Sequence, residues 1–392
     1  MDEINNLLTR GVEQIYPNRE ALEKVLRSGK KLKLYQGFDP SMPSLHLGSY
    51  VGLMKLRQFQ KLGHEVIFLV GDFTAMIGDP DKLSARKPLT REETRANSEN
   101  WKDQAKNIID FEGTNPAKLV YNSEWLDKVS FKDLIEITSK FTAQQMLERD
   151  MFQKRMSEGR PVYLHELLYP VAQAYDSVFM EVDLELAGSD QTFNALAGRT
   201  LMNAMKNWEK YVMTTKLLVD DKGDKVGKTT GNALFLGSPP KDFYGGIMAF
   251  PDEVIALSFE LLTELPWQNL EKQITENPMG EKKRLAFEVV KLLWGEIMAK
   301  EAQTHFENVY QKGEMPTEVP VREIRNEKLE IGRLIVGVGL AKSQADAKRL
   351  IQQKAVEING SLITDHKSLI TTNNGDILKV GKTRYVKLEV RS

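Results

Sequence analysis

The order of apolar and polar residues over positions 32–70 predicts a strand, a helix and a second strand. The short run Leu32–Tyr35 is closed by a glycine turn. The continuous run Val66–Val70 is rich in β-branched residues, as in a strand buried on both faces. Between these runs, apolar residues recur at helical spacing from Leu47 to Leu62. Together they form a βαβ unit, which implies a parallel sheet.

The rest of the chain divides into helical stretches, a linker and a small mixed module. Residues 91–187 have a mainly helical pattern, and a tight polar turn is expected at Asp220–Asp224. Helices are expected again beyond Pro240, with Leu285–Trp294 as the clearest apolar segment. The prolines and glutamates of Gly313–Pro320 indicate a linker. The remaining C-terminal residues change to a short helical pattern and then to strands and turns.

Composition and charge narrow the classes of function. The chain has no cysteine, which excludes disulfides and thiolate metal sites, and its five histidines form no metal-ligand pattern. It lacks a secretory signal pattern and any apolar stretch long enough to cross a bilayer, so a cytoplasmic location is expected. The net charge is −1, yet residues 330–392 carry 11 Lys and Arg against 6 Asp and Glu. This surplus fits a nucleic-acid-binding domain or a merely basic surface equally well.

One candidate site follows the first predicted strand. His46, Gly48 and Ser49 fall in the first turn of the predicted helix, where unpaired N–H groups and the helix dipole suit phosphate oxygens. Gly48 would let a nucleotide approach the backbone. Gly37 and Asp39 would lie at the carboxyl end of the strand, where parallel sheets bind ligands. For this segment alone, an ordinary helix N-cap with an incidental histidine is the alternative.

A second candidate is a basic loop after the polar turn. Lys225 and Lys228 are three residues apart, Gly227 lies between them, and Thr229 follows. Two lysines on a short mobile loop can stabilise the charge of a departing pyrophosphate in the transition state. Taken alone, such a motif is common on protein surfaces.

A third candidate is a polar stripe on one helix. Tyr169, Gln173 and Asp176 are spaced i, i+4 and i+7, which places them on one helical face. If that face is buried, these groups need hydrogen-bond partners. A bound amino acid would supply them, with an ammonium for Tyr169 and Gln173 and a hydroxyl for Asp176. A polar face turned to water is the alternative.

In combination, these segments resemble the class I aminoacyl-tRNA synthetases of the tyrosyl/tryptophanyl branch. The segment at His46 is similar to their His-Ile-Gly-His signature, with Leu47 in place of isoleucine and Ser49 in place of the second histidine. Lys225–Thr229 resembles their Lys-Met-Ser-Lys-Ser loop in its Lys-Phe-Gly-Lys-Thr form, with Val226 in place of phenylalanine.

Further matches point to the bacterial-type tyrosyl-tRNA synthetases. Tyr169–Asp176 follows their Tyr-Pro…Gln…Tyr-Asp pattern, and Tyr35 matches the tyrosine that reads the substrate phenol together with the aspartate. Residues 187–191 resemble Gly-Gly-x-Asp-Gln, with Ala187 in place of the first glycine. A methyl group is tolerable there unless the backbone needs a positive φ.

The resemblance assigns a role to each candidate residue. The implied catalytic residues are His46, Lys225, Lys228 and Thr229. The implied tyrosine-binding residues are Tyr35, Asp79, Tyr169, Gln173, Asp176 and Gln191. The implied ATP-binding residues are Gly37, Asp39, Ser41, His46, Gly48, Gly188, Asp190 and Lys228. Lys82 and Arg86 are candidate pyrophosphate ligands on a loop that departs from the family pattern, and a basic loop without a role is the alternative.

The C-terminal segment resembles the small RNA-binding module named after ribosomal protein S-four. A helix over Gln344–Lys354, with Ser343 as its N-cap, precedes a predicted strand at Val356. Four basic residues could contact RNA phosphates without reading sequence: Lys342, Lys348, Arg349 and Lys354.

The resemblance thus implies an α/β fold with three domains. These are a Rossmann-like parallel-sheet catalytic domain with a helical dimer-interface insertion (1–235), a helical anticodon-side domain (236–320) and a small α+β RNA-binding domain (330–392). The implied activity is that of a tyrosine–tRNA ligase, with L-tyrosine, ATP and tRNA(Tyr) as substrates. Mg²⁺ is expected with ATP, without a protein-ligated metal, and the expected state is a homodimer without membrane contact.

Two rival functions remain open. A tryptophanyl-tRNA synthetase would share the fold and both signatures, but Tyr35 and Asp176 argue against it. A catalytically silent RNA-binding protein would act through residues 333–392, and the intact His46 and Lys228 count against that reading.

Overall fold

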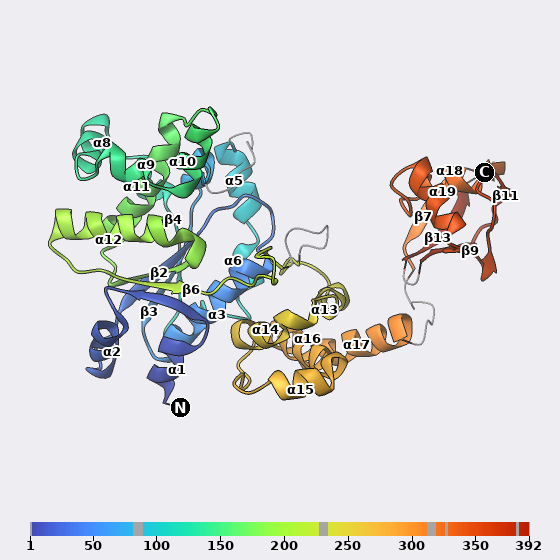
Figure 1. Ribbon diagram of the computed structural model, residues 1–392, viewed down its shortest axis with the longest axis horizontal. Helices are drawn as coiled ribbons and strands as arrows, with labels where there is room; N and C mark the ends of the chain where they lie inside the picture. Colours follow the sequence, from blue (N-terminus) through green and yellow to red (C-terminus); the bar gives the residue numbers. More distant parts are fainter. Residues whose placement is uncertain are drawn as a thin grey trace. The chain divides into compact units, whose positions relative to one another are not determined.

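The computed structural model in Figure 1 describes residues 2–80, 89–226, 234–311, 319–325, 328–381 and 384–391. The chain separates into two compact units, Met1–Ala299 and Lys300–Ser392. No helix in the described ranges is long and apolar enough to cross a bilayer.

The first unit is built on a six-stranded sheet. Its strand order is β1 (Val12–Tyr16), β6 (Tyr211–Thr215), β5 (Leu184–Gly188), β2 (Lys33–Phe38), β3 (Glu65–Val70) and β4 (Lys118–Tyr121). Neighbouring strands are parallel except for β1, which is antiparallel to β6. Helix α3 (Leu47–Lys61) joins β2 to β3, so the predicted βαβ unit and parallel sheet are confirmed. Strands β1, β4, β5 and β6 were not predicted.

Helices cover both faces of this sheet. Figure 1 shows α11 (Leu164–Met180) and α12 (Thr192–Lys206) on one side, and α1 (Glu3–Thr9), α2 (Arg19–Arg27) and α3 on the other. Alternate residues of the central strands face opposite layers. On the α11 side, Tyr35, Ile67 and Leu69 pack in one buried cluster with Ala172 and Met180. Tyr35 therefore points into the layer that carries the predicted polar stripe.

Further helices surround the sheet and follow it. Those before α11 are α4 (Thr74–Ile77), α5 (Arg91–Ser98), α6 (Trp101–Ala105), α7 (Ser123–Leu126), α8 (Phe131–Thr138), α9 (Ala143–Leu147) and α10 (Asp150–Ser157). Those after β6 are α13 (Pro240–Met248), α14 (Ile255–Leu262), α15 (Glu271–Glu276), α16 (Pro278–Trp294) and α17 (Glu296–Phe306). The predicted turn at Asp220–Asp224 is present, with the amide of Gly223 bonded to the carbonyl of Asp220 at 2.9 Å.

The second unit combines two helices with short strands. The helices are α18 (Ile331–Gly337) and α19 (Gln344–Gln352). A five-stranded sheet has the order β10 (Ser361–Leu362), β9 (Val356–Ile358), β12 (Ile377–Val380), β13 (Arg384–Arg391) and β7 (Val321–Arg325). A second ladder pairs β11 (Leu369–Thr371) with β8 (Lys328–Glu330). Ser343 caps α19 by accepting from the amide of Asp346 at 3.2 Å, as predicted. Most of the predicted linker lies outside the described residues.

A buried histidine connects α3 to the start of β2. The ring of His64 is 4% exposed, and its Nδ1 accepts a hydrogen bond from the amide of Leu32 at 3.0 Å. Burial, with Lys31 as a smaller cause, lowers the pKa of His64 to about 4. The folded chain therefore holds this imidazole neutral and uses its lone pair as an acceptor.

We expect this histidine to make stability depend on pH in the acidic range. Between the ordinary pKa of about 6.5 and the folded value of about 4, the unfolded chain binds more protons than the folded chain. Stability is therefore lost as the pH falls through this window. His64→Asn keeps a hydrogen-bond acceptor but does not titrate. When the pH is lowered from 7 to 5, the urea midpoint of unfolding should fall further for the wild type than for His64→Asn. Equal falls in the two proteins would contradict the assignment.

Candidate active site

The main pocket of the first unit lies at the carboxyl ends of β2, β5 and β6, between α3 and α11. This is the edge at which parallel sheets bind ligands. All the described members of the predicted site line it: Tyr35, Gly37, Asp39, Ser41, His46, Gly48, Asp79, Tyr169, Gln173, Asp176, Gly188, Asp190, Gln191 and Lys225. Lys82, Arg86, Lys228 and Thr229 lie outside the described residues.

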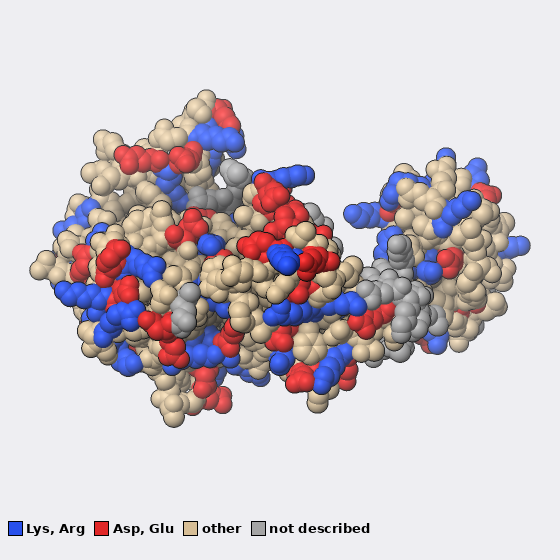
Figure 2. Space-filling model, turned by 60° about the horizontal axis from the view of Figure 1, so that its bottom comes forward, with Lys and Arg blue, Asp and Glu red and all other residues tan. Residues whose placement is uncertain are grey.

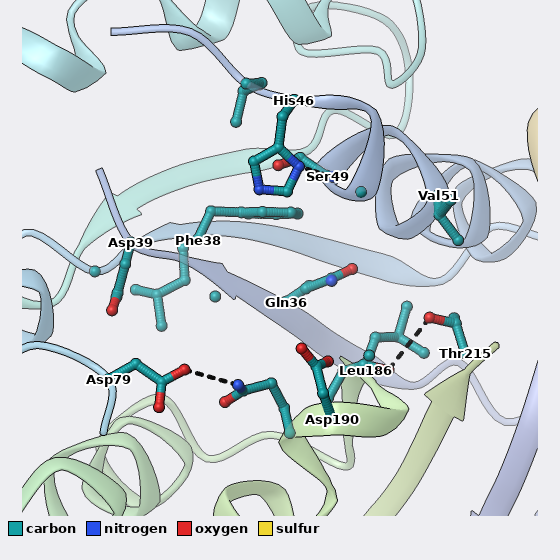
Figure 3. Close-up of a pocket in the computed structure, with 18 of the residues that line it drawn as sticks. Gln36, Phe38, Asp39, His46, Ser49, Val51, Asp79, Leu186, Asp190 and Thr215 are labelled. Atoms are coloured by element: carbon teal, nitrogen blue, oxygen red, sulfur yellow. Dashed lines mark hydrogen bonds between the residues drawn. The ribbon is translucent and has the colours of Figure 1, made fainter. Parts of the chain in front are cut away.

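The first turn of α3 forms one wall of the pocket. Figure 3 shows His46 on the α3 side and Asp79 and Asp190 on the opposite side. His46 is the N-cap of α3, and its Nδ1 accepts from the amide of Ser49 at 3.3 Å. Because Nδ1 is the acceptor, a neutral ring carries its proton on Nε2, which can donate to a phosphate oxygen.

The need for glycine at position 48 is explained by packing within the protein before the approach of a nucleotide, expected from the sequence, is considered. A Cβ at this position would lie 2.8 Å from Cε1 of His46 and 3.0 Å from its Nδ1. Only glycine therefore leaves room for the imidazole to fold over the start of the helix. The expected approach of a nucleotide to this backbone comes second to that packing.

The polar stripe of α11 faces the pocket rather than water. Tyr169 is 6% exposed, and its hydroxyl donates to Asp39 at 2.8 Å. The amide of Gln173 donates to Glu185 at 2.8 Å. The predicted shared face is confirmed, but the idea that a ligand alone would satisfy these groups is corrected. Each side chain of the stripe already has a hydrogen-bond partner within the protein. Buried polar atoms need such a partner even when no ligand is bound.

Asp176 lies at the buried end of the stripe. It is 1% exposed, and it accepts from Nε1 of Trp125 at 2.8 Å and from Nδ2 of Asn122 at 3.2 Å, on different oxygens. Burial raises the pKa of Asp176 well above its ordinary value, while these two donors lower it. A carboxylate has about four acceptor positions, so Asp176 can still accept from a ligand hydroxyl.

Tyr35 completes the buried end from the sheet side. It is 0% exposed, and its hydroxyl lies 2.9 Å from Oγ of Ser177. Burial raises the pKa of Tyr35 well above its ordinary value, and the charges of Glu185 and Asp176 raise it further. The hydroxyl therefore stays protonated and can donate or accept a hydrogen bond in the pocket.

Asp79 and Gln191 both line the pocket and are hydrogen-bonded to each other. Nε2 of Gln191 donates to Oδ2 of Asp79 at 2.8 Å. A guanidinium nitrogen of Arg149 lies 3.9 Å from the other oxygen of Asp79, and both side chains are buried. Asp79 is thus held between a cation and an amide. Arg149 was not among the site residues predicted from the sequence.

The far end of the pocket is more open. Nζ of Lys225 lies 2.5 Å from Oδ2 of Asp190, and their side chains are 41% and 34% exposed. A Cβ at Gly188 would lie 2.6 Å from the Asp190 carboxylate, which explains the glycine there. Ala187 lies within extended β5 and has no positive φ, so its methyl group is accommodated.

Several residues of the site were missed by sequence reasoning. Glu185 could have been noticed, because a charged residue is unusual in the otherwise apolar run of β5. Lys210 and Ser177, which bond to Glu185, carry no comparable local signal. Gln36 also lines the pocket, and its Oε1 is buried without a hydrogen-bond partner in the described structure.

Comparisons with known proteins agree with this geometry. Residues 27–311 match the family described as tRNA synthetases class I (W and Y). Residues 312–387 match the tyrosine–tRNA ligase SYY-like C-terminal domain. The tyrosine–tRNA ligase of Thermotoga maritima is 42% identical over 97% of this chain and 96% of its own length. That of Aquifex aeolicus is 40% identical over 97% of both chains.

Solved structures show the same fold. A C-terminally truncated mitochondrial tyrosyl-tRNA synthetase of Coccidioides posadasii has a TM-score of 0.65 and 25% identity, covering 78% of this chain and 91% of that one. The Archaeoglobus fulgidus tyrosyl-tRNA synthetase complexed with L-tyrosine has a TM-score of 0.57 and 20% identity, covering 77% and 99%. With two family matches and relatives similar over nearly their full length, the chain belongs to the tyrosyl-tRNA synthetases of class I.

Proposed function

We propose that this chain activates L-tyrosine with ATP, giving tyrosyl-adenylate and pyrophosphate, and then transfers tyrosine to the 3′-terminal ribose of tRNA(Tyr). One observation carries the proposal. A single pocket joins a buried polar end, at Tyr35 and Asp176, to an open end at the start of α3. The buried end suits a phenol and the open end suits a nucleotide.

The buried end supports selection of tyrosine. The Asp176 carboxylate would accept a hydrogen bond from the phenol hydroxyl, and the Tyr35 hydroxyl would donate a hydrogen bond to the phenol oxygen. Phenylalanine would displace water from these groups without offering a hydrogen bond, so the hydrogen-bonding positions of Tyr35 and Asp176 that protein partners do not fill would stay empty. An indole N–H needs an acceptor at a different position, so these two residues also disfavour tryptophan.

The middle of the pocket would hold the reacting groups of tyrosine. We assign the ammonium to Asp79, Tyr169 and Gln173, and the carboxylate to the region of Gln191. The carboxylate would attack the α-phosphate of ATP in line. No protein nucleophile is needed, because the reaction is accelerated by positioning and by stabilisation of charge.

The open end would hold ATP. The phosphates would lie at the start of α3 with His46, Gly48 and Ser41, close to Gly37 and Asp39. The adenosine would lie against Gly188, with its ribose hydroxyls on Asp190. Lys225, which is paired with Asp190 in this structure, would then move away from that carboxylate towards the pyrophosphate. In this assignment, Lys225, Lys228 and Thr229 act on the leaving group.

Mg²⁺ is expected to enter with ATP, because phosphate oxygens are ligands that it prefers. Bound there, it would neutralise part of the phosphate charge. Within the part of the chain that the structure describes, no group of three His, Asp or Glu residues is placed to hold a metal. We assign Mg²⁺ to the phosphates of the nucleotide. Lys82 and Arg86 remain candidate pyrophosphate ligands.

The C-terminal unit is proposed to bind tRNA. Lys342, Lys348, Arg349 and Lys354 are all exposed on or beside α19. Figure 2 shows Lys and Arg side chains spread over the visible face of this unit. Such contacts attract the phosphate backbone and position RNA. We retain 1–235, 236–320 and 330–392 as the proposed catalytic, anticodon-side and RNA-binding domains.

We also propose that the chain forms a homodimer through α8 and α11, which pack against each other. Phe131 on α8 is 78% exposed and Leu164 on α11 is 77% exposed, with Ile135 and Phe179 more than half exposed. These large exposed apolar side chains lie on two helices that pack together, and on that basis we assign the interface to α8 and α11.

Changing both Phe131 and Leu164 to Glu should convert the dimer to a monomer, because the two new carboxylates would have to be buried in the interface. Sedimentation velocity experiments measure this change. Ile297→Glu, at a residue 74% exposed on α17, is the matched control and should remain dimeric. A dimer that survives the double substitution would place the interface elsewhere.

The activity is tested by amino-acid-dependent exchange of pyrophosphate into ATP, without tRNA. Tyrosine should support exchange, while phenylalanine and tryptophan should not, because only tyrosine pairs with both Asp176 and Tyr35. Exchange with tryptophan would keep the fold and the mechanism but change the substrate. No exchange with any of the three would favour the silent RNA-binding alternative.

The role of Lys225 predicts a specific kinetic loss. Lys225→Met should lower the exchange rate constant by about 100-fold, the range found for removing a group that stabilises transition-state charge. The KM for tyrosine should stay unchanged because Lys225 lies at the other end of the pocket. Lys222→Met, in the adjacent exposed turn, is the control. A rise in the tyrosine KM with an unchanged rate would contradict this role.

A further inference from the structure

A fully buried lysine lies behind the tyrosine end of the pocket. Lys210, directly before β6, is 0% exposed. Its Nζ donates to Oγ of Ser177 at 2.8 Å and to a carboxylate oxygen of Glu185. Glu185 is 1% exposed and lies in register beside Tyr35 on the neighbouring strand. Removing two charges from water is unfavourable unless further hydrogen bonds compensate, so this pair calls for an explanation.

The pair extends into the pocket along two branches. Through Ser177 it reaches the hydroxyl of Tyr35, 2.9 Å from Oγ. Through the other oxygen of Glu185 it reaches the amide of Gln173, which donates at 2.8 Å. Tyr35 and Gln173 both line the pocket, whereas Lys210 does not. The Lys210 ammonium therefore contacts both Ser177 and Glu185, which are the hydrogen-bond partners of Tyr35 and Gln173.

The lysine also sets the direction of the hydrogen bonds. An ammonium can only donate, so it occupies one lone pair of Ser177 Oγ. The serine proton then has two acceptors, the Tyr35 oxygen at 2.9 Å and Glu185 Oε2 at 3.4 Å. The tyrosine oxygen is closer, and Glu185 Oε2 is already bonded to Lys210. With Ser177 donating to it, Tyr35 keeps its own proton, which the neighbouring Glu185 carboxylate or a ligand in the pocket can accept.

Helix α12 is shaped to leave room for this cluster. A Cβ at Gly198 would lie 2.4 Å from Nζ of Lys210, 3.0 Å from Oγ of Ser177 and 3.1 Å from Oε2 of Glu185. Glycine is unfavourable inside a helix compared with alanine. Its presence facing the ammonium indicates that the cluster, rather than helix stability, determines this residue.

We propose that Lys210 is a positioning residue for the selection of tyrosine. Through Ser177 it directs the hydroxyl proton of Tyr35 towards the substrate phenol, and through Glu185 it fixes the amide of Gln173. Lys210 itself touches no substrate. This inference rests on the proposed activation of tyrosine.

The test is the ratio of kcat/KM for tyrosine to kcat/KM for phenylalanine in pyrophosphate exchange. Lys210→Met should lower this ratio by at least about tenfold, the loss expected for one misdirected hydrogen bond. The KM for ATP should not change. Because both amino acids are measured in one preparation, the ratio does not depend on the fraction of folded enzyme. If Lys210→Met does not fold, Gly198→Ala displaces the ammonium and should lower the same ratio.

A rescue variant separates positioning from general damage. Adding Glu185→Gln to Lys210→Met removes the uncompensated carboxylate and provides an amide that can donate to Ser177, so part of the ratio should return. Lys206→Met, which removes only the exposed pair with Glu181, is the control. An unchanged ratio in active Lys210→Met enzyme would overturn the inference while leaving the proposed function intact. A wild type that does not exchange with tyrosine would overturn both.

Discussion

The structure depends on the requirement that polar groups buried at the carboxyl end of the sheet find partners. Tyr35, Asp176 and Glu185 are each at most 1% exposed, and each is hydrogen-bonded to another part of the first unit. Their partners come from α7 and the residue before it, from α11 and from the residue before β6, so satisfying them fixes how the helices sit on the sheet. The same requirement makes the pocket selective, because a ligand that enters must replace the hydrogen bonds of the water it displaces.

The parallel sheet brings the chemistry together. His46 precedes α3, Asp190 follows β5 and Lys225 follows β6, yet all three line one pocket because these strands end at the same edge. In the proposed function, ATP binding rearranges the open end of the pocket. Lys225 is paired with the Asp190 carboxylate, which we assign to the ribose of ATP. The buried end is already arranged before any ligand binds. In the proposed function, specificity and catalysis belong to opposite ends of one cavity.

Local signals were enough to predict the elements with strong periodicity. Helix α3, strand β3 and the stripe of α11 follow from apolar or polar spacing, and the two signature motifs identified the site by resemblance. Strand β4, four residues long, and the edge strand β1 gave no pattern distinct from loops. The Lys210 cluster could not be predicted, because its partners Ser177 and Glu185 lie 33 and 25 residues away and meet it only through tertiary packing. Likewise, sequence spacing cannot show that Gly48 makes room for His46.

In the proposed function, Tyr35 and Asp176 form a preorganised site for a phenol. Isothermal titration calorimetry of the wild-type protein with L-tyrosine and L-phenylalanine, in the absence of ATP, tests it most directly. Tyrosine should bind at least about 100-fold more tightly, because phenylalanine fills neither the remaining acceptor position of Asp176 nor the hydrogen-bonding position of the Tyr35 hydroxyl that faces the ligand. Equal affinity for the two amino acids would contradict it, since selection would then have to arise outside this pocket end.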